Sequence, residues 1–414
     1  MGGAYMNEWK RYKIADIATL SNGINFDKSA YASGVKLIGV ADFKDRIYPD
    51  YSLLQEVASN IVRSGDYLEK GDIVFVRSNG NKELVGRCMM INDDIPVTYS
   101  GFCINLRLND KKKFNPVYFN YLFRTRLFRK SMTGTAVGAN IQNLSQSRLG
   151  SCEVNVPDVE TQKDIATILS RYDSLIENYQ KQIKLLEEAA QRLYKEWFVD
   201  LRFPGHGNTK IVDGVPEGWE KKAINDICTH ISSGSTPSRR NKSYWEDGTI
   251  KWVKTKELLD GWIFDTEEYI TDDGLKNSST KIYPVNSILM AIYASPTLGR
   301  LGILASECCC NQAALCLIAN EQIVSWQWLY WKLFELRDEF NSIARGAGQQ
   351  NISGIVVKKK EVLVPAKQVV DAFTNIANPI FESIKNKSNQ IRLLTEARDR
   401  LLPKLMSGEK DNNY

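Results

Sequence analysis

The fold is decided by residues 172–197, which read YDSLIENYQKQIKLLEEAAQRLYKEW. Apolar or small residues recur in this stretch at alternating steps of four and three, which is the spacing of a coiled-coil seam. We therefore expect a long amphipathic helix from about Thr161 to Phe198, with Asp158 and Glu160 suited to its positively polarised start. The predicted seam consists of Tyr172, Ile176, Tyr179, Ile183, Leu186, Ala190, Leu193 and Trp197.

A second stretch repeats this pattern 208 residues further along the chain. Its polar residues match as well as its apolar ones, as in Gln182 with Gln390. We expect a second helix from about Val369 to Met406, in which Pro403 should kink or fray the last turn. A lysine and an arginine interrupt its seam, and their stems can pack while their charged heads reach water. This seam consists of Ile380, Ile384, Lys387, Ile391, Leu394, Arg398, Leu401 and Leu405.

The repeat extends into the segments that precede each helix. The stretch beginning at Trp9 matches the one beginning at Trp219, at an offset of 210. Two further pairs match, Gly86-Arg87 with Gly299-Arg300 and Asn143-Leu144-Ser145 with Asn351-Ile352-Ser353. A nearly constant offset shared by polar and apolar residues indicates internal duplication.

The sequence thus predicts an α+β protein with two pseudo-symmetric α/β domains, separated by two long helices that pair as an antiparallel coiled coil. Ile73–Val76 and Ser287–Met290 should be buried strands. Each helix would be on the order of 50 Å long, enough to hold two domains roughly one DNA turn apart. Alternatively, the helices only cap their own domains or form a dimer with another chain. The predicted segments are a first domain (1–160), a central helix (161–203), a linker (204–215), a second domain (216–366), a C-terminal helix (367–408) and a tail (409–414).

The composition is that of an ordinary globular protein, with 43% hydrophobic and 25% charged residues among 414. No apolar run is long enough to predict a membrane span, and we expect no signal peptide. The net charge of +5 is only mildly basic and does not by itself indicate nucleic acid. The eight cysteines form no C-x-x-C pair, so we expect buried, reduced thiols in a cytosolic protein rather than a zinc site, with Cys308–Cys310 on an apolar strand.

The sequence predicts no catalytic, cofactor-binding or metal site. Asn115-Pro116-Val117-Tyr118 resembles the Asn-Pro-Pro-Tyr motif of adenine methyltransferases, but no glycine-rich strand-turn-helix precedes it. A cap for a helix running through Phe128 is the better interpretation. No G-x-x-x-x-G-K-S/T loop is present, which excludes ATP-driven translocation in this chain. The two histidines, His206 and His230, lie among glycine, serine and threonine, where turn residues are the ordinary interpretation.

The order of short motifs resembles the specificity subunits of type I restriction-modification enzymes over nearly the whole chain. These motifs include Pro216-Glu217-Gly218-Trp219, then Gly234 to Pro237 followed by Tyr244-Trp245, and the stretch from Trp197 to Gly205. The first half lacks the Thr-Pro and Tyr-Trp signature, so the two domains have diverged.

The resemblance implies two target-recognition domains that each read one part of a split, asymmetric double-stranded DNA site. It also implies that the helices set the spacer and bind two methyltransferase subunits, and that restriction-translocase subunits join the complex. S-adenosylmethionine, ATP and Mg are expected on those partners, no cofactor on this chain, and a cytoplasmic location without membrane contact. Two alternatives stay open, a standalone DNA adenine methyltransferase and a helical scaffold that does not bind DNA.

Loops between strands are where we expect DNA contacts, with Lys and Arg on phosphates and Arg, Asn or Gln on base edges. In the first half the candidates are Arg77, Ser78, Asn79, Asn81, Lys82, Arg87, Asn140, Gln142 and Asn143. In the second half they are Thr236, Ser238, Arg239, Arg240, Thr297, Arg300, Arg345, Gln349, Gln350 and Asn351.

Overall fold

The computed structural model describes residues 9–43, 46–78, 84–133, 143–293, 297–346 and 351–407. The chain divides into two compact units, a first unit of residues 1–177 with 393–414 and a second unit of residues 178–392. The division falls inside both long helices rather than at their ends. Each unit therefore contains a globular part together with a portion of each helix, whereas the sequence-based division set the helices apart as separate segments.

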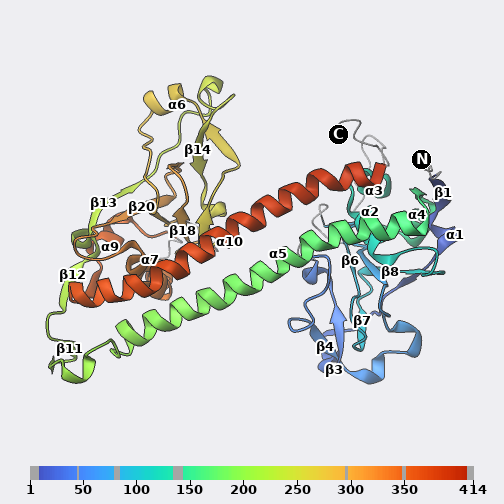
Figure 1. Cartoon of the computed structure of the whole chain (residues 1–414), viewed down its shortest axis with the longest axis horizontal. Helices are drawn as coiled ribbons and strands as arrows, with labels where there is room; N and C mark the ends of the chain where they lie inside the picture. Colours follow the sequence, from blue (N-terminus) through green and yellow to red (C-terminus); the bar gives the residue numbers. More distant parts are fainter. Residues whose placement is uncertain are drawn as a thin grey trace, which may run out of the picture. The chain divides into compact units, whose positions relative to one another are not determined.

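The first unit is built on a central antiparallel sheet with a smaller sheet beside it (Figure 1). The central sheet has the order β2 (Ala18–Asn22), β8 (Cys103–Leu108), β5 (Ile73–Val76) and β6 (Cys88–Met90). The smaller sheet has the order β4 (Gln55–Val57), β3 (Tyr31–Ile38) and β7 (Val97–Tyr99), with β3 and β7 parallel. A separate antiparallel pair joins β1 (Lys10–Lys13) to β9 (Glu153–Val156). The predicted buried strand at residues 73–76 is confirmed by β5.

Four helices shorter than the long pair complete the described part of the first unit. They are α1 (Ile14–Ile17), α2 (Pro116–Arg124), α3 (Arg126–Thr133) and α4 (Gln146–Ser151). Asn115 caps α2 as predicted, because its side chain accepts from the backbone N–H groups of Val117 and Tyr118. The prediction that this helix runs through Phe128 is wrong. Thr125 adopts an extended conformation, and its hydroxyl accepts from the N–H of Phe128, which starts a new helix.

The second unit repeats this architecture. Its central sheet has the order β13 (Cys228–Ser233), β20 (Ala314–Ala319), β17 (Ile288–Ala291), β18 (Leu301–Leu304) and β15 (Gly261–Ile263). Its smaller sheet has the order β16 (Glu268–Ile270), β14 (Ile250–Val253) and β19 (Cys309–Cys310). The strands β12 (Glu220–Ala223) and β21 (Glu361–Val364) pair, and β10 (Ile211–Val212) forms a hairpin with β11 (Val215–Pro216). Its shorter helices are α6 (Asp272–Lys276), α7 (Trp326–Glu335), α8 (Arg337–Gly346) and α9 (Gly354–Lys359).

Matching hydrogen bonds show that the two globular parts are copies of one fold. Ser145 caps α4 through the N–H of Arg148, and Ser353 caps α9 through the N–H of Val356. In both copies the first strand pairs antiparallel with the last before the long helix. Among the described residues, the parallel edge strand β15 has no counterpart strand in the central sheet of the first unit. The predicted duplication is therefore confirmed.

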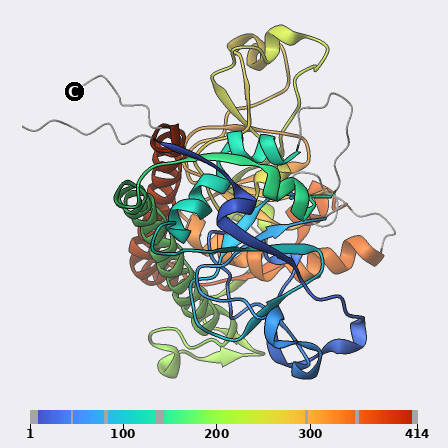
Figure 2. The same ribbon diagram turned by 90° about the vertical axis from the view of Figure 1, so that its right-hand side faces the viewer.

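The two long helices run antiparallel (Figure 1 and Figure 2). The first is α5 (Val159–Tyr194), extended by a π turn at Lys195–Val199, and the second is α10 (Lys367–Ser407). Within the second unit, Phe373 packs on Trp197 and the Lys387 ammonium lies over the ring of Tyr179. There the numbering therefore rises along one helix as it falls along the other. All the predicted seam residues are buried or half-buried.

Two expectations for α10 need correction. The heads of Lys387 and Arg398 do not simply reach water. The Arg398 guanidinium pairs with Asp173, and the Lys387 ammonium lies 5.5 Å from the ring centroid of Tyr179. Long cationic side chains can pack at a helix seam when a carboxylate or an aromatic face receives the charge. The last turn does not fray at Pro403, because α10 continues to Ser407.

Candidate nucleic-acid interface

Four chain segments meet at one edge of the central sheet in each unit, and we call this region the loop edge. In the first unit it consists of Gly23–Asn25, Ser100–Phe102, Arg77-Ser78 and Asn143. In the second unit it consists of Gly234–Thr236, Asn311–Ala313, Ile292-Tyr293 and Asn351. Five of the nineteen predicted DNA contacts lie in these two sets, namely Arg77, Ser78, Asn143, Thr236 and Asn351.

A glycine is required where the first segment of each loop edge crosses the second. A Cβ atom on Gly23 would lie 2.3 Å from the carbonyl oxygens of Tyr99 and Ser100. A Cβ atom on Gly234 would lie 2.1 Å from the carbonyl oxygen of Cys310. Both distances are far below van der Waals contact with backbone atoms, so each crossing depends on the missing side chain.

Several backbone hydrogen bonds of one loop edge recur at the equivalent residues of the other. The N–H of Ile24 donates to the carbonyl of Tyr99 at 2.9 Å, and the N–H of Ser235 donates to that of Cys310 at 2.9 Å. The third segment is tied in the same manner. The backbone N–H of Arg77 donates to the carbonyl of Phe102 at 2.8 Å, and that of its counterpart Ile292 donates to the carbonyl of Ala313 at 2.9 Å. Isolated β-bridges then join Ser78 to Asn143 and Tyr293 to Asn351.

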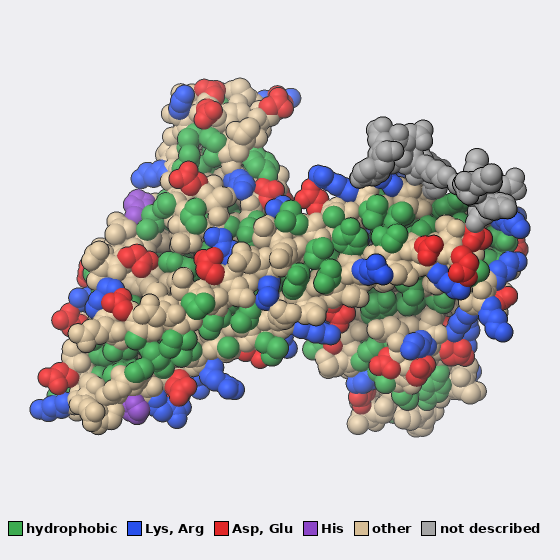
Figure 3. All heavy atoms as spheres, in the orientation of Figure 1, with side chains coloured by type: hydrophobic (Ala, Val, Ile, Leu, Met, Phe, Trp, Pro, Cys, Tyr) green, Lys and Arg blue, Asp and Glu red, His purple; other side chains and the backbone are tan. Residues whose placement is uncertain are grey.

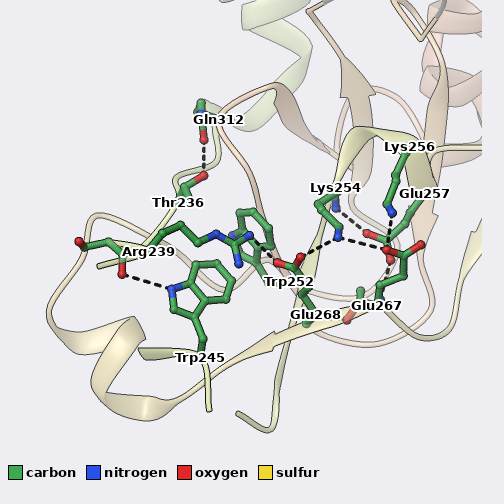
Figure 4. Close-up of polar contacts among 12 residues, drawn as sticks. Thr236, Arg239, Trp245, Trp252, Lys254, Lys256, Glu257, Glu267, Glu268 and Gln312 are labelled. Atoms are coloured by element: carbon green, nitrogen blue, oxygen red, sulfur yellow. Dashed lines mark hydrogen bonds and ion pairs between the residues drawn. The ribbon is translucent and has the colours of Figure 1, made fainter. Parts of the chain in front are cut away.

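The side chains on this shared backbone differ between the units. Asn25 corresponds to Thr236, Gly101 to Gln312, Phe102 to Ala313 and Ser78 to Tyr293. Two of them are large and exposed, with 62% of Phe102 and 40% of Tyr293 accessible. The Thr236 hydroxyl donates to the side-chain oxygen of Gln312 (Figure 4), which leaves the exposed amide N–H groups of Gln312 free to donate. Amide, hydroxyl and aromatic groups are the kinds that read base edges or contact a thymine methyl.

The recurring Gly-Arg pairs mark one hairpin turn in each unit. Gly86 and Gly299 both have φ of +77°, which favours glycine. The N–H of Gly86 donates to Val76 at 2.9 Å, and that of Gly299 donates to Ala291 at 2.9 Å. In return, the carbonyls of Arg87 and Arg300 accept from the backbone N–H groups of Val76 and Ala291, respectively. Arg87 and Arg300 therefore recur at the same place on the turn, and both are half-buried.

Arg239 is held by its neighbours instead of being free in a loop (Figure 4). Its guanidinium carbon lies 3.5 Å from the ring centroid of Trp245 and 5.0 Å from that of Trp252, and it forms an ion pair with Glu268. The Trp245 indole N–H donates to the carbonyl of Ser238 at 3.3 Å, so the rings also fix the loop that precedes the arginine. Stacking and pairing together fix the guanidinium. The Tyr-Trp motif of the sequence has this structural role.

The carboxylate of Glu268 is shared with Lys254, whose ammonium lies 2.8 Å away and also binds Glu267 at 3.1 Å. Burial alone would raise the pKa of Glu268, but the hydrogen bonds from Lys254 and Arg239 outweigh it and lower the pKa. The hydrogen bond to Glu268 in turn raises the pKa of Lys254. The positive charges of Arg239 and Lys254 are therefore neutralised by the neighbouring glutamates. Arg240, by contrast, is exposed and makes no hydrogen bond or ion pair with the described residues.

On the face shown in Figure 3, basic and acidic side chains are interspersed within each unit rather than gathered in a patch of one sign. The remaining predicted contacts are dispersed: Ser238 is exposed, and the Thr297 hydroxyl donates to the carbonyl of Tyr293 at 3.2 Å. Several others lie outside the described residues, as does the side chain of Arg345. They are Asn79, Asn81, Lys82, Asn140, Gln142, Gln349 and Gln350.

Sequence reasoning missed Asn25, Phe102, Tyr293 and Gln312 as loop-edge residues. The place of Gln312 beside Thr236 depends on a contact between residues 76 positions apart, which local sequence patterns do not indicate. Within the described ranges, no group of three or more His, Cys, Asp or Glu side chains could hold a metal ion. In the same ranges no helix has the length and apolar character needed to cross a membrane.

Comparisons with known proteins agree with this duplicated architecture. Residues 6–188 and 216–393 match the type I restriction modification DNA specificity domain. The type I restriction enzyme MjaIX specificity subunit of Methanocaldococcus jannaschii is 29% identical over 70% of this chain and 68% of its own length. The HindI specificity subunit of Haemophilus influenzae is 24% identical over 98% of this chain and all of its own.

A solved structure shows the same fold. The type I restriction-modification S subunit from M. genitalium superposes with a TM-score of 0.63 over 98% of both chains, at 16% identity. Both halves of the present chain match one family, and the fold agrees over nearly its full length. The chain therefore belongs to the family of type I restriction modification DNA specificity domains, and it is a specificity subunit, the recognition component of such a system and not its enzyme.

Proposed function

We propose that this chain reads a DNA site in two parts, with one globular domain on each half-site. The observation that carries the proposal is the pair of loop edges, which share their backbone hydrogen bonds but differ in their side chains. A common frame would present each domain to the DNA in the same manner. Different side chains on that frame would select different bases, since base edges are read by side-chain hydrogen bonds and apolar contacts.

The test exchanges loop-edge side chains within one unit only. Thr236→Asn and Gln312→Gly give the second unit the side chains that the first unit carries at those places. We expect the bases recognised in one half-site to change while the other half-site stays as it is. A change in both half-sites would contradict one domain per half-site. If the assembled complex shows no salt-dependent binding to duplex DNA, the scaffold alternative is favoured.

We further propose that the long helices dock two methyltransferase subunits. Large apolar side chains are exposed in matching pairs on these helices: Ile168 (38%) with Ile376 (46%), and Leu185 (64%) with Leu393 (47%). The members of each pair are 208 residues apart. Each unit therefore carries one exposed isoleucine and one exposed leucine at equivalent helix positions. Two like surfaces suit two copies of one partner, and burying a leucine contributes about 1.5–3 kcal/mol.

Stoichiometry tests the docking. Native mass measurement of the chain mixed with its methyltransferase subunit should give two bound copies for the wild type and one for Leu185→Asp or Leu393→Asp. Ser174→Asp, at an exposed polar position of α5, is the matched control and should leave two. Restriction subunits would join this complex. We place S-adenosylmethionine, ATP and Mg on the partners, none on this chain, and the assembly in the cytoplasm.

A further inference from the structure

A cavity of about 230 Å³ opens in the second unit, beside the edge strand β15 and helices α5, α7 and α10. Its walls include five aromatic residues, Trp262, Tyr330, Trp331, Phe334 and Phe381. The carboxylate residues Glu187, Glu188 and Asp260 also line it, together with Lys184, whose ammonium lies 4.0 Å from the Glu188 carboxylate. A cavity that combines aromatic faces with carboxylates suits a cationic group, which is attracted to both.

Polar groups in this cavity lack partners among the described residues. The indole N–H groups of Trp262 and Trp331 are buried and make no hydrogen bond with the described residues. Only 6% of the Trp331 residue is exposed to solvent. Glu187 is half-buried and forms no hydrogen bond or ion pair within the described ranges. Burial and the neighbouring Asp260 raise the pKa of Glu187, as expected for a carboxylate without a cation. Asp260 itself is already paired with Arg337.

In the first unit an arginine of α10 pairs with an aspartate of α5 that also accepts from a tyrosine of α2. Arg398 occupies the α10 position that corresponds to Ala190 of α5, at the 208-residue offset. Its partner Asp173 corresponds to Phe381 by the same offset. The Tyr121 hydroxyl donates to Asp173, and Tyr121 stands six residues after its helix cap, as Trp331 does after Ser325.

The first unit thus contains a Tyr-Asp-Arg contact where the second has Trp331, Phe381 and Ala190. Trp331 and Phe381 line the cavity of the second unit, whereas Ala190 is fully buried in the core. Two cations of the second unit already stack on its walls, Arg337 on Phe334 at 4.4 Å and Lys385 on Trp262 at 4.6 Å. No contact between either cation and Glu187 is present in the described part of the chain.

We infer that this cavity receives an arginine side chain of a docked methyltransferase subunit, beside Trp331, Phe381 and Glu187. The inference rests on the proposed docking. The guanidinium would stack on the aromatic walls and donate to Glu187, and the indole N–H of Trp331 would donate to a carbonyl oxygen of the same partner segment. Arginine suits the site better than lysine, because its planar group can stack and form charge-assisted hydrogen bonds together.

Binding of a small probe tests the chemistry of the cavity without the partner. The full chain with ¹⁵N-labelled tryptophan is titrated with L-argininamide, and the indole signals are assigned with Trp262→Phe and Trp331→Phe. We expect saturable shifts of these two signals, weaker shifts with L-lysinamide, and about tenfold weaker binding in Glu187→Gln. The exposed Glu196 provides the control Glu196→Gln, which should bind like the wild type. Equal binding by Glu187→Gln and the wild type would overturn the inference.

Assembly with the methyltransferase subunit separates this inference from the docking on which it rests. Glu187→Gln should lower partner affinity at least tenfold, whereas the control Glu196→Gln should bind the partner like the wild type. The melting temperature of both variants is measured as well. A wild type that binds no methyltransferase subunit would contradict the docking. A wild type that binds it, with a folded Glu187→Gln binding equally well, would contradict only the arginine.

Discussion

The guanidinium of Arg398 on α10 donates to the carboxylate of Asp173 on α5, inside the first unit. Only 18% and 11% of the two side chains are exposed, and the Tyr121 hydroxyl donates to the same carboxylate. Burial, followed by the charge of Asp173, raises the pKa of Tyr121, which keeps that hydroxyl protonated as a donor. The contact joins both long helices to α2.

Breaking this contact should destabilise the protein. Asp173→Ala leaves the Arg398 guanidinium largely buried without its main partner, which should cost about 3 kcal/mol. Urea denaturation followed by circular dichroism measures the change. Glu396→Ala removes the more exposed ion pair with Arg400 and should cost less than about 1 kcal/mol. Equal losses for the two variants would show that the Asp173 contact contributes no more than a surface pair.

The glycines at the loop edges should not tolerate a side chain. Gly23→Ala and Gly234→Ala would each press a Cβ atom against backbone carbonyl oxygens, and each should lower stability by more than about 2 kcal/mol. Gly65→Ala is the control, since nothing lies within 4 Å of its added Cβ. Thermal unfolding compares the three. If Gly234→Ala and Gly65→Ala have the same melting temperature, the backbone at Gly234 does not approach the Cys310 carbonyl as closely as described.

The cysteines should react slowly in the folded protein. Burial raises the pKa of Cys103 and of Cys309 to about 12, and the described cysteines form no disulfide. Because only thiolates react, alkylation by iodoacetamide at pH 8 should be much slower than in urea. The folded thiols hold their protons more tightly than unfolded ones, so stability should fall as the pH rises above the ordinary thiol pKa near 9 toward 12. Rapid labelling of folded protein at pH 8 would contradict this account.

Arg239 and Arg240 should have different roles although they are adjacent. Arg240→Ala should weaken DNA binding by the assembled complex on all sequences alike and reduce the salt slope by about 1, as expected of a phosphate contact. Arg239→Ala should loosen the loop by removing the Trp245 stack and the Glu268 pair. Fluorescence anisotropy at several salt concentrations separates the two effects. A base preference altered by Arg239→Ala with an unchanged melting temperature would instead assign Arg239 to base reading.

How far the sequence predicted this structure depended on the range of the interactions involved. The long helices, the duplication and the Asn115 cap follow from local periodicity and capping, and all were predicted. The break at Thr125 was missed because a threonine within a helical pattern gives only a weak stop signal. The Arg398 contact and the Arg239 stack were missed because their partners are distant in sequence or on another strand. Loop-edge residues were identified where they follow a predicted strand, as Arg77 does, or belong to a repeated motif, as Asn143 does.

The central claim is that two copies of one reading domain select two parts of one DNA site. It is tested most directly by mapping methylated bases across the genome of cells that express this chain with its partner subunits. The account predicts two short recognised tracts separated by a gap of fixed length, with Thr236→Asn and Gln312→Gly altering one tract only. A single uninterrupted tract, or a change in both tracts, would contradict it.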